Sequence, residues 1–190
     1  MFLPPLKELR QNEPNLQSML AICFATLIQG YVPPRIEYRP YGPVIEVRVE
    51  RKGVFEITTD PKASPKTVDH ILRLVRDGFY NQQRVHRVEW WVTQWGAPAS
   101  KDKPIDSMEV LSGGSGKQLE FEESSVDYLR GVCGIASTGL QVGGDSQIFI
   151  LKHDYERLWR SYAVLGKVTK GMDVVDSIHK GDRILSMKVK

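Results

Sequence analysis

One stretch of alternating apolar and polar residues constrains the fold of this chain most strongly. Residues 44–50 read VIEVRVE and residues 54–58 read VFEIT, with Arg51, Lys52 and Gly53 between them. Alternation with a period of two gives a β-strand one apolar face and one polar face. A short glycine-containing link between two such strands is typical of a β-hairpin. The sequence therefore predicts an antiparallel pair with one face on a core and the other in water.

The segment after the hairpin carries the start and stop signals of a helix. Ser64 stands at the expected N-cap, Pro65 at the first helical position, and Gly78 just beyond the last turn. Between them, apolar residues recur at intervals of three and four, which is the spacing of one helix face. The residues on this predicted buried face are Val68, Ile71, Leu72 and Val75.

Other apolar segments predict further strands and one more helix. Strands are expected at residues 83–92, 131–136, 147–152, 162–169 and 184–189, and a second helix at residues 172–179. These elements do not alternate regularly, as strands and helices do in a parallel α/β sheet. The pattern therefore predicts a mainly β protein, folded as a closed antiparallel β-barrel with two capping helices.

The first 43 residues differ in composition from the rest of the chain. Residues 31–43 contain Pro33, Pro34, Pro40 and Pro43, which is typical of a stiff connector. The sequence thus predicts an N-terminal extension over residues 1–43 and a compact domain over residues 44–190. The apolar run at residues 19–28 has about half of the roughly twenty residues that a bilayer span needs, so no stable membrane span is expected.

Three interpretations of this apolar run stay open. It can form a short helix over residues 13–29 that packs on the protein or on a partner. It can be the apolar part of an export signal, although residues of both charge signs precede it. It can carry lipidation at Cys23, although the large side chain of Ile22 precedes that cysteine. The compartment stays open, with the cytoplasm favoured over export.

Charge and cysteine content exclude several functional classes. The chain has 26 Lys+Arg against 23 Asp+Glu, with both signs interleaved, so no nucleic-acid surface is expected. Two cysteines in different contexts, Cys23 and Cys133, do not predict a disulfide framework. The histidines lack the spacing of a metal site. Residues 113–117, GGSGK, predict a flexible loop instead of a phosphate-binding loop, because Gln118 follows where a serine or threonine is needed.

Six short motifs resemble those of the cyclophilins. They are GFY at residues 78–80, VHRV at 85–88, WVTQWG at 91–96, DSQIFI at 145–150, YAVLGKV at 162–168 and GMDVVDSI at 171–178. They follow one another in the order and approximate spacing of that family, within a resemblance that covers residues 44–189. The resemblance implies an eight-stranded barrel with two capping helices. It also implies peptidyl-prolyl cis–trans isomerase activity that assists protein folding.

Rotation about an X–Pro peptide bond makes and breaks no covalent bond. Its barrier of about 18–20 kcal/mol comes from the amide resonance that is lost on twisting. A catalyst needs an apolar slot for the proline ring and a donor aimed at the twisted amide, and it needs no metal or cofactor. The resemblance implies that Arg87 is this donor, because it follows His86 as the family's catalytic arginine follows a histidine. Gln94 matches the glutamine that binds the substrate backbone.

The resemblance also implies a set of substrate-binding positions. Ala136 and Ser137 match the edge that carries the substrate backbone. The positions that match the proline pocket and its surroundings are His86, Trp91, Val92, Phe149, Leu158 and Tyr162. Apolar strand residues usually lie in a core, so that alternative stays open for the apolar members of this set. The expected partners are proline-containing polypeptides, and the protein is expected to be a monomer.

Several positions depart from the family's pattern. The chain is one residue short between Arg87 and Gln94, and Glu89 and Trp90 replace the usual proline and glycine. Arg157 takes the place of a tryptophan that contacts cyclosporin in many relatives, so tight binding of that drug is not expected. These departures leave a second interpretation open, a non-catalytic module of cyclophilin fold that binds proline-containing segments or a protein partner.

Overall fold

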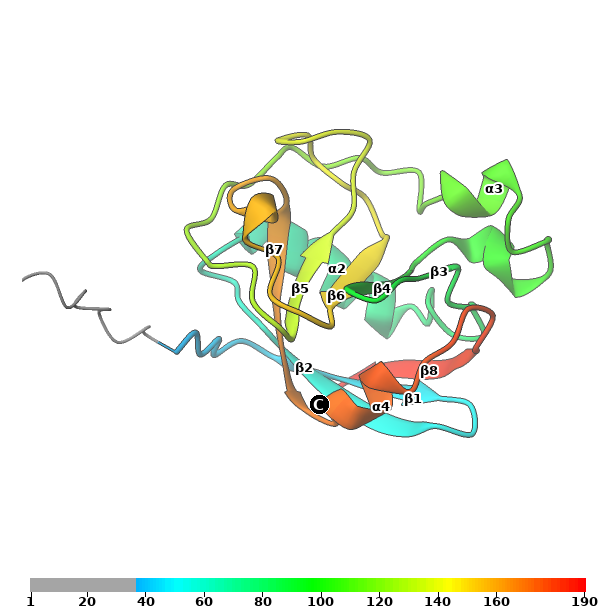
Figure 1. The fold of residues 1–190 in the computed structure, drawn as a ribbon. Helices are drawn as coiled ribbons and strands as arrows, with labels where there is room; N and C mark the ends of the chain where they lie inside the picture. The colour runs from blue at the N-terminus through cyan, green and yellow to red at the C-terminus, as the bar shows by residue number, and fades with distance from the viewer. Residues whose placement is uncertain (1–36) are drawn as a thin grey trace, which may run out of the picture. The chain divides into compact units, whose positions relative to one another are not determined.

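A computed structural model describes residues 37–190, and its compact unit spans Tyr38–Lys190 (Figure 1). The apolar run and most of the predicted N-terminal extension lie outside the described residues. The hydroxyl of Tyr38 donates a hydrogen bond to Asp60 Oδ2 at 2.9 Å, and the N–H of Gly42 donates to the carbonyl of Thr59 at 2.8 Å. Residues 38–43 are therefore part of the compact unit, while the domain start at residue 44 stays a prediction.

The described residues form eight strands, three α-helices and two short 3-10 helices. The strands are β1 (Val44–Val49), β2 (Gly53–Thr59), β3 (Arg87–Val88), β4 (Val92–Trp95), β5 (Val132–Ile135), β6 (Ile148–Leu151), β7 (Ala163–Lys170) and β8 (Ile184–Val189). The helices are α2 (Pro65–Arg76), α3 (Met108–Leu111), α4 (Met172–Asp176), η1 (Pro98–Lys101) and η2 (Glu156–Leu158). The last four predicted strands are confirmed to within one residue at each end.

All eight strands belong to one antiparallel sheet, curled into a half-barrel. Its order is β3-β4-β6-β5-β7-β2-β1-β8. Helix α2 packs against β7 and β8, and α4 packs against β2 (Figure 1). The prediction of a mainly β, antiparallel protein is confirmed. Among the described residues, no helix is long and apolar enough to cross a bilayer.

The predicted hairpin is confirmed as β1 and β2. Val44 pairs with Thr58 and Val49 pairs with Gly53 at the turn. The turn places Arg51 at φ 58° and Gly53 at φ 127°, a region of backbone space that glycine enters without strain. The side chains buried by the alternation are Ile45, Val47, Val49, Phe55 and Ile57.

Helix α2 is confirmed, but its first turn is capped from a distance. Ser64 occupies the N-cap position, yet its side chain makes no capping hydrogen bond. The carboxylate of Glu122 accepts the N–H of Lys66 at 3.0 Å and that of Thr67 at 2.8 Å instead. A carboxylate at this end of a helix accepts hydrogen bonds from free N–H groups and interacts favourably with the positive end of the helix dipole. The local signal thus located the helix start correctly, and a loop far along the chain supplies the cap.

The small helices differ from the prediction. Helix α4 ends at Asp176 instead of 179, because the N–H of Ile178 bonds the carbonyl of Val175 in a tighter turn. Ile178 is nevertheless only 2% exposed, so its apolar character reports burial in the core. Helix α3 was not predicted, and the count of two helices is wrong for the described chain. A helix of four residues is too short to show a period in sequence.

The predicted strand at residues 83–92 is wrong as a single element. The chain forms only the two-residue strand β3, reverses direction, and returns as β4. The N–H of Glu89 donates to the carbonyl of Val92 at 2.9 Å and closes this turn. Strand β4 is buried along its whole length, so it lacks the alternation that identifies a strand with one wet face.

Buried apolar side chains form two clusters. The larger lies between the sheet and α2. The smaller consists of Val92, Tyr128, Val132, Phe149, Leu151 and Val164. Trp91, Leu158 and Tyr162 are half-buried and pack against the smaller cluster. This smaller cluster therefore forms the apolar floor beneath the residues predicted to bind substrate.

Candidate active site

The short hairpin of β3 and β4 brings Arg87 and Gln94 together. The two residues are cross-strand partners, and Arg87 Nη1 donates to Gln94 Oε1 at 3.3 Å. The hydrogen bond between the N–H of Glu89 and the carbonyl of Val92 closes the tight turn between the two strands. The two predicted catalytic residues are thus adjacent.

Glu89 binds two of the predicted site residues at once. Arg87 Nε donates to Glu89 Oε1 at 2.7 Å, and Trp91 Nε1 donates to Glu89 Oε2 at 2.9 Å. The guanidinium carbon of Arg87 also lies 5.2 Å from the centre of the Trp91 ring. The hydrogen bond from Arg87 lowers the pKa of the Glu89 carboxyl below its usual value. The Arg87 side chain is still 41% exposed, so it can reach a bound peptide.

Gln94 is held by a second glutamine that the sequence analysis did not assign. Gln94 Nε2 donates to Gln147 Oε1 at 2.6 Å. Gln147 Nε2 donates in turn to the carbonyls of Gly113 at 2.8 Å and Leu111 at 3.2 Å. The side-chain nitrogen of Gln94 donates to Gln147, so the side-chain oxygen of Gln94 is the atom that faces Arg87. Gln147 lies in the motif DSQIFI, so its position was visible although its role was not.

His86 lies next to Arg87 in sequence but is buried. The residue is only 3% exposed, and its Nδ1 has no hydrogen-bond partner among the described residues. Burial lowers the pKa of His86 from 6.5 to about 4. The ring is therefore neutral near pH 7.

Phe149 forms the centre of the apolar floor. Its ring meets the Tyr162 ring edge-on, with centres 5.5 Å apart. Gly134 is its cross-strand partner on β5, and a Cβ at Gly134 would lie 2.4 Å from the Phe149 ring. Only glycine leaves room for the ring at this place. Val92 is 1% exposed, so it supports the floor from within the core.

A cavity of about 490 Å³ opens beside Gln94. Ala136 and Ser137 lie on its wall together with Gln94 and Gln147. The N–H of Ala136 donates to the carbonyl of Gln147 at 2.8 Å, and Ser137 Oγ donates to the carbonyl of Gly139 at 2.6 Å. The structure therefore gathers the predicted backbone-binding edge and the two glutamines around one hollow.

Comparison with known proteins assigns the chain to a family. A family model described as cyclophilin type peptidyl-prolyl cis-trans isomerase/CLD matches residues 44–189. The chain belongs to the cyclophilin family. The resemblance in the motifs is confirmed, and so is the prediction that this cyclophilin is a peptidyl-prolyl cis–trans isomerase.

Bacterial proteins are among the similar relatives. A probable peptidyl-prolyl cis-trans isomerase of Brucella suis biovar 1 is 38% identical over 177 residues, which cover 91% of this chain and 89% of the relative. Peptidyl-prolyl cis-trans isomerase B of Bacillus subtilis is 29% identical over 145 residues, covering 75% and 94%. The Brucella match is longer than residues 44–190, so it extends into the N-terminal extension.

Solved structures support the fold. A cyclophilin type peptidyl-prolyl cis-trans isomerase of Cryptosporidium parvum has a TM-score of 0.65 and 20% sequence identity. It covers 79% of this chain, and 98% of its own chain is matched. The cyclophilin AquaCyp293 of Hirschia baltica has a TM-score of 0.59 and 19% identity, with 76% and 73% covered.

This cyclophilin has an aromatic group beside Arg87, in which Tyr155 is the member that the sequence analysis did not assign. The Trp91 ring stacks on Tyr155 with centres 4.3 Å apart and planes 13° apart. Trp90 lies edge-on to Tyr155 and is 68% exposed. Two adjacent tryptophans at residues 90 and 91 were visible in the sequence, but their stacking partner is more than sixty residues away.

Proposed function

We propose that Arg87 and Gln94 are the catalytic pair of this isomerase. The observation that carries the proposal is their cross-strand hydrogen bond next to the apolar floor around Phe149. When an X–Pro amide twists, its nitrogen regains a lone pair, and an N–H of Arg87 can donate to it. A charge-assisted hydrogen bond contributes about 1.5–3 kcal/mol, so shape and exclusion of water must supply the rest.

The proline ring is proposed to lie on the floor around Phe149. Trp91, Leu158 and Tyr162 frame that floor, and all three are half-buried, as the walls of an open pocket are. Val92 is part of the buried cluster that makes the floor, and the buried His86 directly precedes Arg87. Ala136 and Ser137 carry the substrate backbone past the cavity, as the resemblance implies.

Barrel closure is proposed on separate evidence. The sheet order ends at β3 and β8, and the residues just before β3 bond the start of β8. The N–H of Gln82 donates to the carbonyl of Ile184 at 2.8 Å, and the N–H of Val85 donates to the carbonyl of Asp182 at 2.9 Å. These bonds support a closed eight-stranded barrel in which residues 82–85, just before β3, bond residues 182–184 too irregularly to form a strand.

The test is an NMR exchange measurement of cis–trans rates in a blocked Xaa-Pro peptide. Arg87→Ala is expected to lower kcat/KM at least about tenfold, which corresponds to about 1.4 kcal/mol of transition-state stabilisation. Arg48→Ala is the matched control, because Arg48 is an exposed strand arginine on β1 that also lies near a glutamate. An Arg87→Ala protein that is folded and as active as the control would overturn the assignment.

The ion pair of Arg87 with Glu89 favours the second candidate, a non-catalytic proline-binding module. If Glu89 withholds Arg87 from the substrate, the wild type binds the peptide without accelerating exchange, and Glu89→Gln raises the exchange rate. If Glu89 only orients Arg87, Glu89→Gln leaves the rate equal or lowers it. The same NMR samples report both binding and exchange, so the two candidates are distinguished directly.

A further inference from the structure

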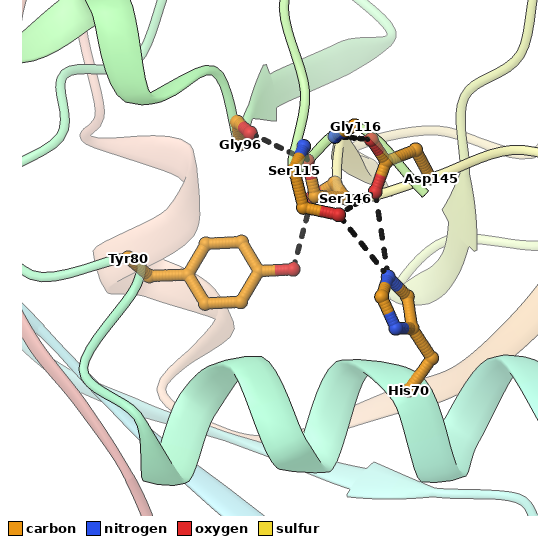
Figure 2. A network of polar contacts seen from close by, with 7 residues as sticks. All are labelled: His70, Tyr80, Gly96, Ser115, Gly116, Asp145 and Ser146. Carbon is orange, nitrogen blue, oxygen red and sulfur yellow. Dashed lines mark hydrogen bonds and ion pairs between the residues drawn. The ribbon is translucent and has the colours of Figure 1, made fainter. Parts of the chain in front are cut away.

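A polar network joins helix α2 to two loops beside the cavity (Figure 2). His70 points from α2 toward Asp145, with its Nε2 at 3.3 Å from Asp145 Oδ1 and 3.5 Å from Ser115 Oγ. Ser115 Oγ donates a short hydrogen bond to the same carboxylate oxygen. The N–H of Gly116 donates to Asp145 Oδ2 at 2.8 Å. Asp145 therefore binds one residue of the helix and two of the loop.

The network is shielded from water. His70 is 4% exposed and lies on the buried face of α2, next to Ile71 in the core. The Asp145 side chain is 20% exposed. A carboxylate that has lost most of its water needs donors in place of it, and bonds to a charged acceptor are stronger than neutral ones. Asp145 is thus a firm anchor for the groups that donate to it.

Residues 113–116, here called the glycine loop, depend on such an anchor. A Cβ at Gly114 would lie 2.4 Å from Asp145 Oδ2, and one at Gly113 would lie 2.1 Å from the carbonyl oxygen of Glu109. Glycine is required for these close approaches, but it also leaves the backbone with wide conformational freedom. Ser115 is the single residue of the glycine loop with a side chain, and that side chain binds Asp145.

The glycine loop and Asp145 both line the cavity of about 490 Å³ beside Gln94. The loop is also bonded to the catalytic side, because Gln147 Nε2 donates to the carbonyl of Gly113. One wall of the cavity thus consists of Gln94, Gln147 and the edge at Ala136. Another wall is the glycine loop, whose glycines do not fix its backbone conformation.

We propose that His70 and Asp145 are positioning residues that hold the glycine loop as a wall of a binding cavity for a substrate side chain flanking the X–Pro pair. The inference rests on the proposed function, in which Ala136 and Ser137 lead the substrate past this cavity. If the wall is already ordered in the free protein, peptide binding does not carry the entropic cost of ordering it. The network therefore acts on peptide affinity and not on the chemistry at Arg87.

Two peptides with the same X–Pro pair test this. One is a blocked dipeptide, which is too short to fill the cavity, and the other is a blocked hexapeptide with large side chains on both sides of the pair. His70→Leu fills the space of the ring without a donor, and Asp145→Asn weakens the anchor. Both are expected to raise the Kd of the hexapeptide at least about tenfold, the effect of one lost bond to a charged group. Dipeptide Kd and exchange rate stay at wild-type values.

Rescue and control variants separate positioning from packing. His70→Gln keeps an N–H donor and is expected to restore most of the hexapeptide affinity, which a packing role for the ring would not do. Asp69→Asn is the matched control, since Asp69 is exposed on α2 and pairs with Arg73. In His70→Leu and Asp145→Asn, the amide of Gly116 is expected to exchange with solvent faster, whereas Asp69→Asn leaves it unchanged.

The proposal is overturned if the ratio of hexapeptide to dipeptide Kd is the same in wild type, His70→Leu and Asp145→Asn, or if His70→Gln behaves like His70→Leu. Should His70→Leu fail to fold, Asp145→Asn and Ser115→Ala give the same test. Failure of the proposed function gives a different result. In that case the wild-type protein does not accelerate cis–trans exchange in the dipeptide, whatever the Kd ratios are.

Discussion

The molecule contains two hairpins of opposite character. The hairpin of β1 and β2 pairs six residues of β1 in continuous register and buries one face, whereas the hairpin of β3 and β4 pairs only Arg87 with Gln94 and Val88 with Thr93. The first is encoded by local alternation and makes the core. The second depends on its neighbours, because β4 is covered on both faces and β6 pairs along its whole length. A strand that carries a proposed catalytic residue can thus lack a folding signal of its own.

The largest expected effect is a loss of stability from the first hairpin, with the candidate active site unchanged. Ile57→Ala removes a fully buried side chain of β2 and is expected to lower the free energy of unfolding by about 2–5 kcal/mol. The isomerase kcat/KM of the protein that remains folded should not change, because no predicted site residue lies on β2. Denaturant unfolding and NMR exchange on the same sample check both statements. A loss of kcat/KM without a loss of stability would contradict the division of roles between the hairpins.

The next effect is a pH dependence that belongs to the region of the second hairpin. The folded protein holds His86 neutral down to about pH 4, whereas the unfolded chain takes up the proton near pH 6.5. Stability is therefore lost as the pH falls through this window, by about 3 kcal/mol at 1.36 kcal/mol per pKa unit. In His86→Gln this part of the slope should vanish. Parallel stability curves for the two proteins between pH 7 and pH 4 would rule out burial of a neutral His86.

A smaller effect concerns the floor that the second hairpin faces. Gly134→Ala forces a methyl group against the Phe149 ring, and such overpacking costs about 1–3 kcal/mol. We expect both stability and kcat/KM to fall, since displacement of Phe149 closes the proline slot. Gly139→Ala is the control, because its nearest neighbour would be a Val142 methyl at 3.5 Å. Equal behaviour of the two variants in thermal unfolding and exchange would show that the floor adapts.

The smallest effect is a change of preference at the turn of the second hairpin. Trp91→Phe removes the N–H that binds Glu89 but keeps a ring on Tyr155. Stability should change by less than about 1 kcal/mol. The indole is expected to narrow the slot and so to favour a small residue before proline, and Trp91→Phe is expected to relax that preference. Relative rates on Xaa-Ala-Pro and Xaa-Phe-Pro peptides measure this, and identical ratios in both proteins would assign Trp91 to packing alone.

The sequence predicted the helices and strands that are encoded by a local pattern of residues. The first hairpin, α2 and the last four strands appear where periodicity and capping residues indicate them. Arg87 and Gln94 were found through their motifs and are indeed neighbours. The path of the chain between them was not predictable, since the turn at residues 89–92 has no glycine and the strands beside it are buried.

Other parts of the candidate site have no local signal at all. Glu122 caps α2 from more than fifty residues away, and His70 meets Asp145 across seventy-five residues of sequence. His70, the single histidine of α2, is 4% exposed, and nothing in its sequence neighbourhood predicts a partner at Asp145. Only the folded sheet brings such partners together, so their roles can be argued from structure but not from spacing.

The turn of the second hairpin also gives the protein a built-in optical probe. Trp95 is fully buried, whereas Trp90 stands 68% exposed at the rim of the proposed proline slot, beside the stacked Trp91. An indole in water emits at longer wavelength than one in a dry core. A peptide that covers the turn will therefore shift the emission of Trp90 toward the blue, and Trp90→Phe removes that signal. Occupancy of this cyclophilin can thus be followed in unlabelled protein.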